Sequence, residues 1–265
     1  MFRASFNNAT VFFIILINFI SVIASAKCAN NGIYILSTSP ALNKNGLIIL
    51  EFYASSQSLI PDLNKKYAIY LQSGKNKIKL LVTEILKGEF QLTQVVLKPN
   101  SELLENETYT LFIDNLPKFE RNPGRYNEQA HKLENLTFKI SAIIDIDAPI
   151  LENSITESKK TIEHFGCGPE KWVYFNIAGQ DKSELFVRAS VKNKSTGKTT
   201  DYILPIKNGQ VKIGHGMCSG AFYFDPDDEY EVTFLLFDQS GNINKPAKTI
   251  SFDSPTNQNA SSEQE

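Results

Sequence analysis

The chain has 265 residues, a formal net charge of −2, 42% hydrophobic residues and 11% aromatic residues. This balance supplies no basic field, which argues against nucleic acid or an anionic lipid surface as a partner. The apolar content is sufficient for the cores of two domains of about 100 residues each.

The first 26 residues have the layout of a secretory signal peptide. Arg3 precedes an apolar run at 11–23, and small residues (Ala-Ser-Ala) follow at 24–26. The run is shorter than the roughly 20 residues that span a membrane. We therefore expect residues 1–26 to be removed, leaving a chain without a transmembrane anchor that is secreted, periplasmic or at the cell surface.

The first half of the remaining chain has short strand-like runs separated by turn residues about every ten positions, a spacing typical of a β-sandwich. The expected strands cover residues 34–37, 47–53, 67–72, 77–86, 90–97, 108–116 and 136–144. The polar interval 117–132 predicts a long loop. We favour a tolerated insertion over a functional loop there, because surface loops accept extra length at low free-energy cost.

A boundary at residues 145–149 (Asp-Ile-Asp-Ala-Pro) divides the chain into two predicted domains, 27–146 and 147–253. The second series of expected strands covers residues 150–155, 172–178, 185–192, 200–206, 210–213, 221–224, 230–237 and 248–252. Neither half has a helical period longer than two turns, so the predicted class is all-β. The polar tail at 254–265 is expected to be disordered.

Turn and core positions in both halves resemble bacterial immunoglobulin-like domains. In the first half, residues 39–40 (SP) precede 46–52 (GLIILEF), and residues 97–99 (LKP) precede 108–111 (TYTL). In the second half, residues 238–242 (DQSGN) are similar to the turn before the last strand of many immunoglobulin-like and fibronectin-like modules. The resemblance implies two tandem immunoglobulin-like β-sandwiches, a fold that hosts many unrelated functions.

The most specific chemical pattern is a repeated H-x-x-C, at His164 with Cys167 and at His215 with Cys218. We favour a disulfide between Cys167 and Cys218, because paired thiols in an exported chain become oxidised. The alternative is a metal site, in which His164, Cys167, His215 and Cys218 bind zinc, or copper(I) with the help of Met217.

The remaining cysteine, Cys28, lies close to the predicted cleavage site. Lys27 precedes it, and a charge at that position fits poorly into a signal-peptidase pocket, which argues against a lipid anchor. Cys28 is then a free or intermolecularly paired thiol.

Two further patterns each have a functional and a structural interpretation. Carboxylates at 225–229 and at Asp145 and Asp147 suit calcium, and the second pair lies at the domain boundary. Neither segment has a spaced D-x-D-x-D-G loop, which favours ordinary turns. Strand alternation places Trp172 and Tyr174 on one face, as in a sugar-binding platform, but we favour core packing.

The sequence contains no G-x-S-x-G, no H-E-x-x-H and no phosphate-binding glycine loop. We therefore expect no enzyme activity and no cofactor. The favoured function is a secreted or cell-envelope binding or structural module with a protein or glycan partner. The second candidate is an extracytoplasmic metal-binding protein that uses the H-x-x-C pair, and the third is an accessory domain of a secreted hydrolase.

Overall fold

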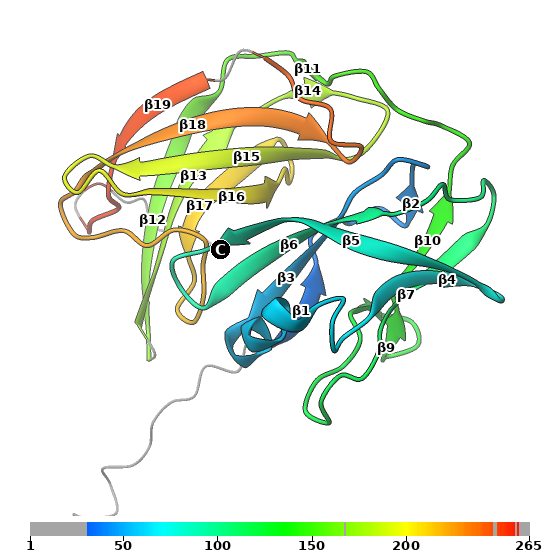
Figure 1. Ribbon diagram of the computed structural model, residues 1–265. Helices are drawn as coiled ribbons and strands as arrows, with labels where there is room; N and C mark the ends of the chain where they lie inside the picture. The colour runs from blue at the N-terminus through cyan, green and yellow to red at the C-terminus, as the bar shows by residue number, and fades with distance from the viewer. Residues whose placement is uncertain (1–30, 167, 246–247, 258, 260–265) are drawn as a thin grey trace, which may run out of the picture.

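The alternating pattern of the sequence forms strands along the whole of the computed structural model, which describes residues 31–166, 168–245, 248–257 and 259 (Figure 1). The described part of the chain is all-β apart from one short helix, so the predicted class is confirmed. No helix in this part is long and apolar enough to cross a membrane.

The first half contains one sheet in the order β1-β3-β6-β5-β4-β7-β10-β2. Its strands are β1 (Gly32–Ile35), β2 (Ala41–Leu42), β3 (Ile48–Tyr53), β4 (Ile69–Ser73), β5 (Asn76–Lys87), β6 (Leu92–Pro99), β7 (Thr108–Ile113) and β10 (Thr137–Ile140). The early residues of β5 pair with β4 and its later residues pair with β6, with a β-bulge between Val82 and Glu84. A bulge bends its strand, so the sheet curves around its own apolar core.

The second half packs a three-stranded sheet, β12-β13-β17, against a four-stranded sheet, β16-β15-β18-β19. The strands are β12 (Thr156–Phe165), β13 (Gly168–Asn176), β15 (Leu185–Asn193), β16 (Thr199–Pro205), β17 (Gln210–His215), β18 (Glu229–Asp238) and β19 (Lys248–Asp253). A short pair, β11 (Ile150–Leu151) and β14 (Gly179–Gln180), lies beside them. Phe175 and Phe234, from opposite sheets, meet in the core with ring centroids 5.0 Å apart.

The two halves share buried apolar surface. Leu50 and Phe52 of β3 face the core of the first half, whereas Ile49 belongs to the cluster formed with the second half. β6 has the same division, with Val95 on one side and Val96 on the other. Burial of both faces explains why these strands are continuous apolar runs rather than alternating ones. The predicted boundary between 146 and 147 stays a prediction, but part of the first half is buried in the apolar cluster of the second.

Polar contacts cross the same interface. The side-chain amide of Gln94 on β6 donates to the carbonyl oxygen of Ile203 on β16 at 2.7 Å and accepts from its N–H at 3.0 Å. Arg188 on β15 donates to both carboxylate oxygens of Glu84 at 3.1 and 2.8 Å. Figure 1 shows the strands of the second half lying against β3, β5 and β6. The surface between the halves is therefore fixed in shape.

Two predictions of irregular structure were wrong. The expectation of no helix longer than two turns missed η1, a 3-10 helix at Ala54–Asp62, which buries Leu59 and Ile60 without a regular apolar period. The interval 117–132 contains β8 (Gly124–Asn127), which pairs with β9 (Lys132–Asn135) as a hairpin rather than as a loop.

Two predictions of strand positions were also wrong. No strand was expected at β12, whose residues are mostly polar because it is an edge strand with both faces partly exposed. Residues 221–224 form no strand; the segment before them makes isolated bridges from Gly220 to Phe90 and to His215.

Parts of both ends of the chain lie outside the residues that the structure describes. Residues 1–26 and Cys28 are outside the described residues, so the signal peptide stays a prediction. The described start of the tail is ordered, because Ser254 and Pro255 are buried and the N–H of Ser254 donates to the carbonyl oxygen of Asp228 at 2.9 Å. Disorder from residue 254 onward was therefore wrong for these residues.

Candidate functional site

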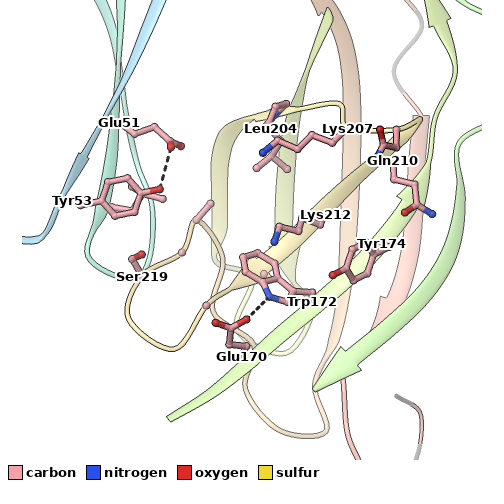
Figure 2. Close-up of a pocket in the computed structure, with 17 residues that line it drawn as sticks. Glu51, Tyr53, Glu170, Trp172, Tyr174, Leu204, Lys207, Gln210, Lys212 and Ser219 are labelled. Carbon is pink, nitrogen blue, oxygen red and sulfur yellow. Dashed lines mark hydrogen bonds between the residues drawn. The ribbon is translucent and has the colours of Figure 1, made fainter. Parts of the chain in front are cut away.

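A cleft of about 590 Å³ opens where the sheet β12-β13-β17 of the second half approaches β3 of the first. Its lining includes polar and aromatic side chains from both halves, and Figure 2 shows them around the opening. The labelled residues are Glu51, Tyr53, Glu170, Trp172, Tyr174, Leu204, Lys207, Gln210, Lys212 and Ser219. The site exists only where the halves meet, so neither predicted domain contains all of it.

The aromatic wall of the cleft comes from the outward face of β13. Alternation along this strand buries Val173 and Phe175 in the core and leaves Trp172 and Tyr174 half-buried on the opposite face. The favoured prediction of core packing for Trp172 and Tyr174 was wrong. Their arrangement is the one expected of a platform, with two aromatic side chains projecting from one face of one strand.

Charged groups surround the indole of Trp172. The ammonium of Lys212 on β17 lies 4.0 Å from the ring centroid, and the indole Nε1–H donates to Glu170 at 3.3 Å (Figure 2). Lys159 lies 4.6 Å from the ring centroid of Tyr174. Cation–π contacts of this kind hold the long lysine side chains against the aromatic faces.

The facing wall is centred on Glu51 of β3. Its carboxylate accepts from Gln94 Nε2 and from the hydroxyls of Tyr53 and Tyr202, each at 3.2 Å. Burial raises the pKa of Glu51, and the three hydrogen bonds oppose that rise. Burial and the adjacent Glu51 carboxylate raise the pKa of Tyr53. Sequence reasoning missed this wall, because its partners come from strands far apart in the chain.

The cleft therefore combines a half-buried indole, one face of which contacts the Lys212 ammonium, with groups that form several kinds of hydrogen bond. Glu51 and Glu170 offer carboxylates, Gln210 offers an amide, and Lys207 and Lys212 offer ammonium donors. Such a set suits a ligand with a flat C–H face to stack on the ring and many hydroxyls along its edge. Binding clefts in general pair apolar walls with a few well-placed polar groups.

The two H-x-x-C segments have different surroundings. His164 is exposed near the end of β12, whereas His215 is buried at the end of β17. The ring of His215 stacks on Tyr223 with centroids 4.8 Å apart and meets Phe90 edge-on at 5.9 Å. Its Nδ1 lies 3.0 Å from the carbonyl oxygen of Gly216, and burial lowers its pKa.

The structure does not bring the described ligands of the alternative metal site together. Among the described residues, His164, His215 and Cys218 are not a group with ligand atoms within 4.8 Å of one another. Cys167 lies outside the described residues, so both the four-ligand site and the disulfide stay predictions. The buried position of Cys218 and the donation by the N–H of Met217 to Glu170, at 3.4 Å, place this segment against the start of β13.

We expect the Cys167–Cys218 disulfide to leave a single titratable thiol, that of Cys28. Ellman titration of the unfolded, unreduced protein measures this count, because unfolding removes any protection by burial. Reduction before unfolding is the control and is expected to release all three thiols of the chain. Three thiols without reduction, together with stoichiometric zinc or copper, would instead favour the metal site at His164 and His215.

The two acidic segments named from the sequence have different surroundings in the structure. Within 225–229, Asp228 accepts from Asn193 and Ser195, and Glu229 pairs with Lys194 at 2.6 Å, which agrees with turn chemistry. At the boundary, Asp147 is exposed, whereas Asp145 is buried. The carboxylates of Asp145 and Asp147 therefore lie in different environments.

No family model matches the chain, and no curated protein matches it. Similar solved structures are a type I pullulanase from Bacillus subtilis str. 168 in complex with maltose (10% identity, TM-score 0.23), a pullulanase from Anoxybacillus sp. LM18-11 (8%, 0.23) and a β-glucuronidase from Ruminococcus gnavus (14%, 0.21). The matches cover 85%, 76% and 77% of this chain but 25%, 24% and 35% of those structures. Likeness at this level carries no argument about fold or function.

Proposed function

We propose that the chain is a secreted or periplasmic, non-catalytic binding protein built from tandem immunoglobulin-like sandwiches, and that its cleft binds a glycan. The observation that carries this proposal is the position of Trp172. Its indole lies half-buried in a cleft rather than in the core, although it stands on a strand whose neighbouring residues fill that core.

The chemistry of the cleft supports a carbohydrate over an apolar ligand. A pyranose ring has one face of C–H groups, which stacks on an indole, and an edge of hydroxyls that both donate and accept. The carboxylates of Glu51 and Glu170, the amide of Gln210 and the ammonium groups of Lys207 and Lys212 are complementary to such an edge. The volume of about 590 Å³ falls within the range of small-molecule sites.

Trp172 is the single tryptophan of the chain, so its fluorescence reports directly on this cleft. We expect a neutral or acidic oligosaccharide from a glycan panel to produce a saturable change in emission, with the same affinity by calorimetry. Replacing Trp172 with alanine is expected to weaken calorimetric binding by about tenfold or more, equivalent to about 1.4 kcal/mol. Trp172→Phe, which retains a smaller ring, is expected to have an intermediate affinity.

Tyr126→Ala is the matched control, because Tyr126 is an exposed aromatic residue on the β8–β9 hairpin, away from the cleft. It is expected to bind glycans as the wild type does. Equal affinities of the wild type and Trp172→Ala, or no binding across the panel, would contradict the proposed function.

A further inference from the structure

Three carboxylates from distant segments meet where the two halves join. Asp145 lies between β10 and β11, Asp181 follows β14, and Asp238 ends β18. One carboxylate oxygen of each lies within 4.8 Å of those of the other two. Their separation in the sequence means that the fold, rather than a turn motif, brings them together.

Two of the three carboxylates are buried, and one buried oxygen has no hydrogen-bond partner. Asp145 is 3% exposed and Asp238 is 0% exposed. Asp145 Oδ2 makes no hydrogen bond, whereas Oδ1 of the same carboxylate accepts from the N–H of Asp147 at 3.3 Å. A buried carboxylate oxygen without a donor destabilises the folded state unless a ligand satisfies it.

Lys182 interacts electrostatically with Asp145 and Asp181 but forms no ion pair with either carboxylate. Among the described residues, Lys182 is the ammonium closest along the chain; it is largely exposed and pairs with Asp147 at 3.1 Å. No ion pair joins a lysine or arginine to Asp145, Asp181 or Asp238 in this part of the chain. Burial, and then repulsion from the other two carboxylates, raises the pKa of Asp238.

Hydrogen bonds hold the three carboxylates in place. Asp238 Oδ1 accepts from the N–H groups of Ser240 and Asn242 at 2.8 and 2.9 Å, and its Oδ2 accepts from Asn242 Nδ2 at 2.8 Å. Asp181 Oδ1 accepts from the N–H and hydroxyl of Ser183 at 2.8 and 2.9 Å. The positions of the oxygens are therefore set before any ligand arrives.

The main chain of Asp145 is anchored from both halves. Its carbonyl oxygen accepts from Asn45 Nδ2 of the first half at 2.6 Å and from Asn242 Nδ2 of the second at 3.0 Å. Its N–H donates to Asn45 Oδ1 at 3.1 Å. Whatever binds the Asp145 carboxylate would thus act on the connection between the halves.

We propose that Asp145, Asp181 and Asp238 bind a divalent cation, with calcium preferred, at this junction. The donors are all oxygens, which suit a hard cation and not zinc or copper(I). Calcium accepts irregular geometry, and water or carbonyl oxygens complete its shell, whereas magnesium requires a near-ideal octahedron. The site is separate from the glycan cleft and does not depend on the proposed function.

Titration of the chelator-treated full chain with calcium chloride alone tests the site. Calorimetry is expected to show one binding site, and the melting temperature is expected to rise with calcium concentration, because a ligand that binds the folded state stabilises it. Asp181→Asn, at the half-exposed member of the group, is expected to weaken binding by about tenfold or more, since ligand charge sets calcium affinity. Asp147→Asn, at the exposed neighbour, is the control and is expected to bind as the wild type does.

Three outcomes would overturn the proposal. The first is an absence of binding heat and of any calcium effect on the melting temperature of the wild type. The second is an unchanged affinity in Asp181→Asn with normal folding by circular dichroism. The third is a stability that ignores calcium and chelator and rises only on acidification, which would show that the three carboxylates share a proton in place of a cation.

Discussion

Replacing Gln94 with alanine is expected to lower the free energy of unfolding by about 2–6 kcal/mol, because it leaves two buried backbone groups of Ile203 without partners at about 1–3 kcal/mol each. Gln94 is 0% exposed, and its amide bonds both the carbonyl oxygen and the N–H of Ile203. β16 is an edge strand, so the Gln94 amide forms the hydrogen bonds to Ile203 that a neighbouring strand would otherwise form. The variant also removes a donor from Glu51.

Urea unfolding followed by circular dichroism measures this change. Gln72→Ala is the matched control, because Gln72 is half-exposed and its amide donates only to the nearby carbonyl of Gly74; its effect is expected to stay within about 0.5 kcal/mol. A change equally small for Gln94→Ala would contradict the assignment. The wild type is expected to unfold in one transition, because the halves share buried apolar residues. Two transitions would indicate that the halves unfold independently.

Replacing Phe175 with alanine is expected to destabilise the protein by about 3–5 kcal/mol, the range for removing a large aromatic side chain from a packed core. Phe175 is 0% exposed and lies edge-on to Phe234 and Phe252, with centroids 5.0 and 5.7 Å away. The cavity would lie between the two sheets of the second half. Denaturant unfolding of the purified variant provides the measurement.

Tyr174→Ala supplies the comparison on the same strand. Tyr174 is the preceding residue and faces the cleft, so its loss is expected to lower stability by about 1 kcal/mol, as for a typical substitution. If both substitutions destabilised the protein equally, the assignment of inward and outward faces along β13 would be wrong.

Most strands could be predicted from the sequence because each leaves a local signal. The apolar run 47–53 and the turn before it gave β3 to within one residue, and 185–192 gave β15 equally closely. η1 and β12 could not be predicted in this way. The helix has no regular apolar period, and the edge strand has no buried face to create one.

The candidate sites were less predictable than the strands. Periodicity placed Trp172 and Tyr174 on one face, but which face of a sandwich strand is buried depends on where the partner sheet lies. Glu51 joins them only through docking of the halves. The sequence indicates Asp145 and Asp147 as candidate calcium ligands but favours ordinary turns there. Asp181 and Asp238, which lie beside Asp145, are distant in sequence, and the Asp147 carboxylate pairs with Lys182.

Strand β5 pairs with both β4 and β6 and therefore connects two parts of the first half rigidly. It runs from its hairpin with β4 toward the second half (Figure 1). There, Glu84 of β5 accepts hydrogen bonds from Arg188 of β15. Sliding β5 along its own axis would break hydrogen bonds to β4 and β6 at once, so the far end of the first half cannot move independently of the interface. A ligand bound in the proposed cleft would therefore be presented at a constant distance and angle from that far end.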